Sequence, residues 1–361
     1  MGTETVQVGL GERSYPIVIG SGVLDTVGAA LAEARIGRRW AIITDDVVGP
    51  LYGGRLVDLL GAAGIDCELI TFAHGESSKH LVTIGTLASE LAERGFDRGD
   101  AVLALGGGVV GDMAGFLASI YLRGIPFVQV PTSLLAQVDS SVGGKTGVDL
   151  DQGKNLVGTF YQPRAVFIDT DVLRTLPEAE FRGGMGEVIK YGASIDADFF
   201  AFLERERPAI QRLEPAAIVP MIRRCCELKA SVVERDEREG GLRRILNFGH
   251  TIGHAVEAAS GYHLIHGLAV AIGTPSVAEL ALRGGVAGAE VVAVITNMLE
   301  AYGLPTTIPP ELDRSQIRRY LQADKKSIGG RVFFVLPEAI GRVVITDRID
   351  PADLEAVLAA P

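Results

Sequence analysis

Apolar and polar positions follow two different periods along the first half of the chain. Residues 5–20 alternate at every second position on either side of Gly11-Glu12-Arg13, which predicts an opening β-hairpin. From residue 24 onward, short apolar runs that suit buried strands take turns with stretches of helical spacing. We expect strands at 40–44, 67–72, 101–105, 126–130 and 165–169, and helices at 24–34, 56–63, 84–94 and 111–122. This alternation is typical of a parallel sheet with helices on both faces.

The pattern changes near residue 170. Residues 171–320 contain many helical and few strand-like runs, and 332–336 and 343–346 resemble a short strand pair. A chain of 361 residues also exceeds the size at which a single core usually keeps growing. We therefore predict an α/β protein with an N-terminal Rossmann-like parallel-sheet domain (1–170) and a mainly α-helical C-terminal domain (171–361).

Composition narrows the class of partner. A formal net charge of −11 argues against a general attraction to nucleic acid or to anionic membranes. No apolar span is long enough to cross a bilayer, and no secretory signal is visible. The three cysteines cannot all pair with one another, two of them are adjacent, and none has CxxC spacing. This pattern favours reduced thiols in a reducing compartment. We expect a cytoplasmic protein that holds any anionic ligand by a local basic cluster.

A glycine-rich turn follows the apolar strand at 101–105. Gly106, Gly108 and Gly111 have GxGxxG spacing, and Asp112 lies in the first turn of the helix that follows. Free N–H groups at such a helix start suit a dinucleotide pyrophosphate. In the usual fingerprint the glycines follow the first strand and the acidic residue that binds the ribose lies about 20 residues later. Here the glycines follow a later strand, and the best candidate for the ribose is Asp45, which lies upstream of them after the strand at 40–44. A tight strand–helix turn without a ligand is the alternative.

Histidines gather late in the chain. His250 and His254 are four residues apart, so on a helix they share one face, and His266 follows after a loop-like segment. This arrangement suits a metal site in which a carboxylate completes the ligand set. Glu187 is the candidate carboxylate, because it sits in an apolar, glycine-rich stretch where an unpaired charge is costly. The alternative is an ordinary pair of core or surface histidines with a glutamate on a helix face.

A long polar segment without clear periodicity runs from 131 to 163 and is expected to be a functional loop. It carries a first set of candidate polar residues, and the helical half carries a second. They are Asp139, Lys145, Lys154 and Asn155, then Lys190, Lys229, Arg243, Asn247 and the Lys325-Lys326 pair. For each one taken singly, a solvated surface position is the alternative.

Five motifs together resemble one known family. They are the segment from GGGVVGD to GGKTGVD, GKNLVGTFYQP, GEVIKYG, LNFGHTIGHA and a late DKK. In these motifs the chain is similar to the 3-dehydroquinate synthases, which are sugar phosphate cyclases of the shikimate pathway. The likeness covers nearly the whole chain. It implies an NAD-binding first half and a second half that carries zinc, for which cobalt can substitute, and most of the substrate contacts.

The resemblance also assigns roles to individual residues. The implied metal ligands are Glu187, His250 and His266, while His254 falls near the metal and substrate without being a ligand. The implied NAD-binding residues are Asp45, Glu76, Lys79, Gly107, Gly108, Asp112, Thr132, Ser133, Lys145 and Lys154. The implied substrate-binding or catalytic residues are Asp139, Lys145, Asn155, Lys190, Lys229, Arg243, Asn247, His254 and Lys326, or Lys325 in its place. Arg123 matches an arginine that reaches the neighbouring subunit's phosphate site, which implies a homodimer.

By the same resemblance, the expected activity is a lyase reaction. It converts 3-deoxy-D-arabino-heptulosonate 7-phosphate to 3-dehydroquinate and phosphate through transient oxidation by NAD, elimination, reduction, ring opening and aldol closure. The sequence departs from the family in HGLAVAIGT, where Leu268 stands in place of a glutamate, and in the GGMG turn before Glu187. The competing interpretations are another sugar phosphate cyclase, a metal-dependent polyol dehydrogenase of similar architecture, and a non-catalytic NAD-binding sensor.

Overall fold

The computed structural model describes residues 2–324 and 331–359, and it divides the chain into two compact units. The first unit contains Met1–Leu176 and Ile218–Glu234, and the second contains Pro177–Ala217 and Arg235–Pro361. This division differs from a single boundary near residue 170, because most of helix α7 (Pro215–Arg235) belongs with the first unit. The Cys226 thiol on α7 donates to the Gln137 carbonyl, and Glu234 accepts from the Gly9 amide.

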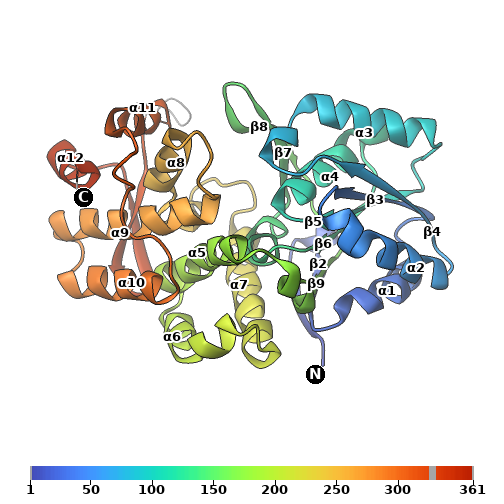
Figure 1. Ribbon diagram of the computed structural model, residues 1–361, viewed down its shortest axis with the longest axis horizontal. Coiled ribbons are helices and arrows are strands. Elements are labelled where there is room, and N and C mark those ends of the chain that lie inside the picture. Colours follow the sequence, from blue (N-terminus) through green and yellow to red (C-terminus); the bar gives the residue numbers. More distant parts are fainter. Residues whose placement is uncertain (1, 325–330, 360–361) are drawn as a thin grey trace. The chain divides into compact units, whose positions relative to one another are not determined.

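A seven-stranded sheet organises the described part of the first unit, with the order β1-β2-β9-β6-β5-β3-β4 (Figure 1). Its strands are β1 (Glu4–Val8), β2 (Tyr15–Gly20), β3 (Arg39–Asp45), β4 (Asp66–Phe72), β5 (Ala101–Gly106), β6 (Phe127–Pro131) and β9 (Val166–Asp169). The β1–β2 pair is antiparallel and the remaining pairs are parallel. Both the predicted opening hairpin and the predicted parallel sheet are confirmed.

Helices cover both faces of this sheet, as the apolar strands require. The helices are α1 (Val27–Ala34), α2 (Gly54–Ala62), α3 (Leu81–Glu93) and α4 (Gly108–Ile120). The centre of β3 is a continuous apolar run because both faces of the strand are buried there. Trp40 and Ile42 pack in the core beneath α1 and α2, whereas Ala41 and Ile43 pack in the core beneath α3 and α4. A strand buried on both faces cannot alternate between apolar and polar residues.

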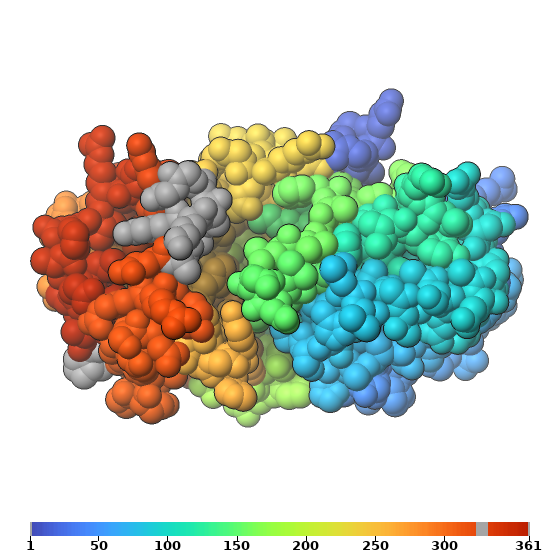
Figure 2. Space-filling model, turned by 90° about the horizontal axis from the view of Figure 1, so that it is seen from above, coloured from blue at the N-terminus to red at the C-terminus, as the bar shows by residue number. Residues whose placement is uncertain are grey.

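The segment predicted as a long loop contains a β-hairpin, β7 (Lys145–Leu150) paired with β8 (Gly153–Phe160). The sequence gives little sign of this hairpin because β8 buries little of its surface. Val148 of β7 is fully buried in the core beneath α4, whereas Val157 of β8 packs against the same core and is only partly buried. Leu156 and Phe160 of β8 are exposed, and the hairpin, green in Figure 2, lies at the molecular surface. A strand with an exposed face of mixed polarity carries little periodic signal.

The second unit is mainly helical, as predicted. Its helices are α5 (Glu178–Ile195), α6 (Ala197–Gln211), α8 (His250–Ala259), α9 (His266–Arg283), α10 (Ala289–Ala301), α11 (Arg314–Asp324) and α12 (Pro351–Ala359). Helix α9 lies at the centre of this unit, where it packs against α5, α8, α10 and α12. The predicted late strand pair is present as β10 (Phe334–Ala339) and β11 (Arg342–Thr346).

The part of the chain that the structure describes contains no helix that is both long and apolar enough to span a membrane.

Candidate active site

In the first unit, the glycine-rich turn joins β5 to α4, which begins at Gly108 with Gly107 as its N-cap. A Cβ atom added at Gly111 would lie 2.7 Å from Gln129 Oε1 on the neighbouring strand, so glycine lets the helix pack closely on the sheet. Added Cβ atoms at Gly107 and Gly108 would approach the hydroxyls of Ser133 (3.5 Å) and Ser140 (3.2 Å). The start of α4 thus offers backbone N–H groups beside two hydroxyls, which are donors suited to a phosphate.

Strand order places this turn at a topological switch point. Along the chain, β3 is followed by β4, which lies beside it on one side in the sheet. Strand β5 is followed by β6, which lies beside β5 on the opposite side. Ligands of open α/β sheets bind at the carboxyl ends of strands that diverge in this way. Asp45 ends β3, and its Oδ1 atom accepts from the Val47 amide (3.0 Å) and the Val48 amide (2.7 Å), which fixes the carboxylate at this edge.

A charged cluster surrounds Lys79, which is almost completely buried. Lys79 Nζ lies 2.6 Å from Asp112 Oδ2, 2.6 Å from Asn155 Oδ1 and 3.9 Å from Glu76 Oε1, while Lys154 Nζ lies 3.5 Å from Glu76 Oε1. Burial raises the pKa of the Asp112 carboxyl, and the nearby lysine opposes this rise. Burial alone would lower the pKa of Lys79, but Asp112 and Glu76 raise it. The structure therefore joins four predicted NAD-binding residues to the predicted substrate residue Asn155.

Helix α7 brings Lys229 to the same unit. Its Nζ atom lies 2.8 Å from Asp139 Oδ1 and 2.6 Å from the Asp139 carbonyl oxygen. Thr132 is buried at the end of β6, where its amide donates to the Gly106 carbonyl, and Lys145 is exposed at the start of β7. These residues are separated in sequence by up to a hundred positions, and the fold of the first unit collects them.

In the second unit, glycines allow three helices to approach closely. A Cβ atom at Gly267 on α9 would overlap the carbonyl oxygen of Gly183 on α5, and one at Gly186 would overlap the carbonyl oxygen of Gly267. Gly273 on α9 meets the carbonyl oxygen of Gly249, the N-cap of α8, in the same way. The GGMG segment that departs from the family pattern, expected as a turn, lies inside α5 and forms part of a close helix contact. This contact brings Glu187 toward the histidines.

The predicted metal-binding residues converge at this contact. His250 Nε2 and His266 Nε2 lie 3.3 and 3.5 Å from the same oxygen, Oε1 of the fully buried Glu187. His254 joins them, and the candidate ligand atoms of the three histidines lie within 4.8 Å of one another. The rings of His250 and His254 have centroids 5.1 Å apart, which confirms the shared helix face predicted from their spacing. All three histidines can therefore reach a common point.

Hydrogen bonds orient two of these rings. His250 Nδ1 lies 3.1 Å from the Phe248 carbonyl oxygen, and His266 Nδ1 lies 2.9 Å from Glu257 Oε2. Burial lowers the pKa of His250 to about 3. Burial would also lower the pKa of His266, but hydrogen bonds to Glu187 and Glu257 raise it to about 10. The His250 imidazole is therefore neutral, whereas His266 holds a proton between Glu187 and Glu257, and a metal ion that binds at Nε2 of His266 must displace this proton.

The other predicted residues of the second unit lie around this cluster or on the 3-10 segment Leu242–Asn247. Lys190 Nζ lies 2.5 Å from Glu187 Oε2. Arg243 is 1% exposed and its Nη1 atom donates to the Glu237 carbonyl (2.5 Å), while Asn247 Nδ2 donates to Glu239 Oε1 (3.2 Å). Lys325 and Lys326 lie outside the described residues.

Sequence reasoning missed Glu257. Its signal was present, because His250, His254 and Glu257 have helical spacing and share one face of α8.

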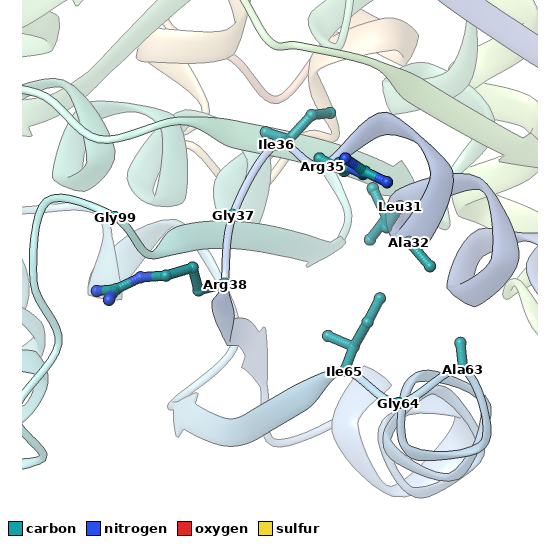
Figure 3. Close-up of a pocket in the computed structure, with 10 residues that line it drawn as sticks. All are labelled: Leu31, Ala32, Arg35, Ile36, Gly37, Arg38, Ala63, Gly64, Ile65 and Gly99. Carbon is teal, nitrogen blue, oxygen red and sulfur yellow. The ribbon is translucent and has the colours of Figure 1, made fainter.

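A hollow in the first unit is lined by Leu31, Ala32, Arg35, Ile36, Gly37, Arg38, Ala63, Gly64, Ile65 and Gly99 (Figure 3). It lies at the ends of α1 and α2, and none of the predicted site residues lines it.

Comparison with known proteins decides the family. The model described as 3-dehydroquinate synthase N-terminal matches residues 69–183, and the model described as 3-dehydroquinate synthase C-terminal matches residues 184–327. The chain belongs to the 3-dehydroquinate synthase family. It is 47% identical to the 3-dehydroquinate synthase of Desulforamulus reducens over 98% of this chain and 99% of that one. It is 50% identical to that of Geobacter metallireducens over 94% of each chain. The resemblance inferred from the motifs is confirmed.

Solved structures place the fold among sugar phosphate cyclases. A 2-epi-5-epi-valiolone synthase from Streptomyces hygroscopicus subsp. jinggangensis, solved with NAD+ and Zn2+ bound, has a TM-score of 0.89 and 30% identity over 97% of each chain. A 2-deoxy-scyllo-inosose synthase solved with carbaglucose-6-phosphate, NAD+ and Co2+ has a TM-score of 0.89 and 28% identity, over 98% of this chain and 99% of that one. A butanol dehydrogenase from Thermotoga maritima shares the fold at 16% identity, with a TM-score of 0.67 over 95% of each chain.

Proposed function

We propose that this chain converts 3-deoxy-D-arabino-heptulosonate 7-phosphate to 3-dehydroquinate and phosphate, as an NAD- and divalent-metal-dependent lyase of the shikimate pathway. The observation that carries the proposal is the convergence of Glu187, His250 and His266 in a chain of this family. The relatives support the reaction class, because proteins named 3-dehydroquinate synthase match this chain over nearly their full length.

The second unit fits a zinc ion. Both His250 and His266 direct Nε2 toward Glu187, while a hydrogen bond at Nδ1 holds each ring in place. Two imidazoles and a carboxylate are a frequent ligand set for catalytic zinc, with one position left for substrate. We assign the ligands as Glu187, His250 and His266, and we place His254 beside the substrate.

The first unit fits NAD. The start of α4 supplies N–H donors for a pyrophosphate, and Asp45 is positioned at the adjoining strand end for a ribose hydroxyl. We assign the remaining contacts to Glu76, Lys79, Asp112, Thr132, Ser133, Lys145 and Lys154. When bound, NAD supplies a reversible hydride acceptor and the metal a Lewis acid for the substrate hydroxyls.

The chain's own polar residues would hold the substrate and neutralise its charge. Arg243 and Lys229 suit the carboxylate and nearby hydroxyls, because a guanidinium offers paired N–H donors and an ammonium a compact charge. Asp139 holds Lys229 in place through the 2.8 Å ion pair. The set assigned to the phosphate end consists of Lys145, Asn155, Asn247 and Lys326, and Lys190 neutralises Glu187. Holding both ends of the substrate lowers the entropic cost of elimination and ring closure.

The test is phosphate release from 3-deoxy-D-arabino-heptulosonate 7-phosphate by the purified protein, with and without NAD, before and after chelation. We expect release that requires both NAD and metal, with no lasting rise in NADH absorbance. A protein that binds NAD and zinc but releases no phosphate from this substrate would be a sister cyclase acting on another sugar phosphate. Steady accumulation of NADH with a simple polyol would indicate a dehydrogenase.

Replacing Arg243 by lysine tests the carboxylate assignment. The change keeps the positive charge but removes the planar set of donors, and we expect kcat/KM to fall about 10- to 100-fold. Arg244→Lys is the matched control, because Arg244 lies on the same segment and stacks on Phe333 at 4.4 Å. Unchanged turnover and KM in Arg243→Lys would remove this residue from the role.

We also propose a cytoplasmic homodimer in which Arg123 serves the partner's phosphate site. Arg123 is exposed in a turn where both it (φ 72°) and Leu122 (φ 49°) have left-handed backbone, a conformation that non-glycine residues adopt at a cost. Light scattering should report a dimer. Mixing inactive Arg123→Ala and Lys145→Ala chains should restore part of the activity, because one site of the mixed dimer is then intact. Two dimeric variants that exchange subunits without recovery would contradict the assignment.

A further inference from the structure

Glu257 is a buried carboxylate for which the site described above has no role. It lies in the last turn of α8 and is 3% exposed. Leaving a carboxylate in such a position is costly unless it has a specific partner. The Oε2 atom of Glu257 lies 2.9 Å from His266 Nδ1, so this charge is directed at the side of the ring that faces away from Glu187.

The backbone of the same residue fixes the segment that leads to His266. The Glu257 carbonyl accepts from the Ser260 hydroxyl (2.6 Å) and from the Tyr262 amide (3.1 Å). The Ser260 hydroxyl in turn accepts from the Leu264 amide (3.1 Å). These bonds tie the turn after α8 to the helix end, so the first residue of α9 returns to the face that carries His250.

The two histidines with Nε2 directed at Glu187 differ in their second hydrogen bond. His250 donates from Nδ1 to a neutral carbonyl, that of Phe248, whereas His266 donates to the Glu257 carboxylate. A charged acceptor forms the stronger bond and increases the electron density of the ring. His266, whose side chain is 30% exposed, is therefore oriented by the stronger of the two hydrogen bonds.

We propose that Glu257 is the positioning residue of the metal site: its carboxylate accepts the Nδ1–H of His266, which keeps the Nε2 lone pair directed at the metal position and strengthens this histidine as a ligand. The proposal rests on the metal dependence proposed above and adds to it a residue that does not itself bind the ion. Residues in this position typically contribute about 10- to 100-fold to metal affinity.

Glu257→Gln tests the proposal, because glutamine keeps the shape of the side chain and removes the charge. Zinc affinity is measured by competition with a chromophoric chelator, and the ligand geometry is followed by the visible absorption of the Co2+-loaded protein. We expect zinc affinity to fall about 10- to 100-fold and the Co2+ spectrum to change, with unchanged circular dichroism. Glu257→Asp keeps the charge on a shorter side chain and should recover part of the affinity.

Glu279→Gln is the matched control, since Glu279 lies on α9 with His266 but pairs with Arg283 at the surface. It should bind zinc as the wild-type chain does. Equal zinc affinity and an identical Co2+ spectrum in wild type and Glu257→Gln would overturn the role of Glu257 and leave the proposed activity untouched. A wild-type chain that binds neither Zn2+ nor Co2+ would overturn both.

Discussion

Replacing Lys79 by methionine leaves the Asp112 carboxylate without its nearest cation. Lys79 Nζ lies 2.6 Å from Asp112 Oδ2, and their side chains are 5% and 20% exposed. Removing one partner of a buried pair costs about 3–5 kcal/mol, and the partial exposure of Asp112 places the expected loss near 3 kcal/mol. At roughly 2–4 °C per kcal/mol, the melting temperature of the first unit should fall by about 6–12 °C.

The loss of stability should depend on pH in a defined direction. Burial already raises the pKa of Asp112, and removing Lys79 raises this pKa further. The folded variant then binds a proton more tightly than the unfolded chain does, so its stability falls as pH rises through the folded pKa. We expect the difference from wild type to be larger at about pH 8 than at about pH 5, measured by scanning calorimetry at both values.

Asp112→Asn and the double variant Lys79→Met/Asp112→Asn complete the cycle. With no carboxylate left behind, the lysine replacement should cost clearly less in the Asp112→Asn background than in the wild type. The same cost in both backgrounds, together with a penalty that does not change with pH, would refute the reasoning. Such a result would place the contribution of Lys79 in the packing of its methylene groups.

Two further predictions concern packing and thiol reactivity. Gly186→Ala should lose about 1–3 kcal/mol of stability in chemical denaturation, because its Cβ would overlap the backbone carbonyl oxygen of Gly267. Gly85→Ala on α3, with nothing within 4 Å, should instead gain about 0.5–1 kcal/mol. Equal shifts in the two variants would contradict the close-packing argument. Burial raises the pKa of the Cys226 thiol to about 12, so a thiol reagent should label the partly exposed Cys67 first and Cys226 only after unfolding. Labelling of Cys226 in the native protein at the rate of Cys67 would contradict this order.

The family and the main elements of the fold were predictable from the sequence. The central residues of strands such as β3 are all apolar because both faces of the strand are buried there, and the helices between the strands have the matching period. The glycine turn after β5 and the spacing of His250 and His254 are local patterns, so they can be identified before any long-range contact is known. The β7–β8 hairpin escaped this reasoning because β8 has no consistently buried face.

Tertiary structure alone decided which distant residues meet. Nothing local to Lys229 predicts its pairing with Asp139, since α7 reaches the first unit from a part of the chain that follows a long segment of the second. Glu257 acquires its significance only when the turn at Ser260 brings His266 back to α8. Likewise, the glycines of α5, α8 and α9 become necessary only when three helices pack at backbone contact. Local sequence governs the hydrogen bonds and periodicity of each element, whereas a site assembled from several elements depends on how their side chains pack together.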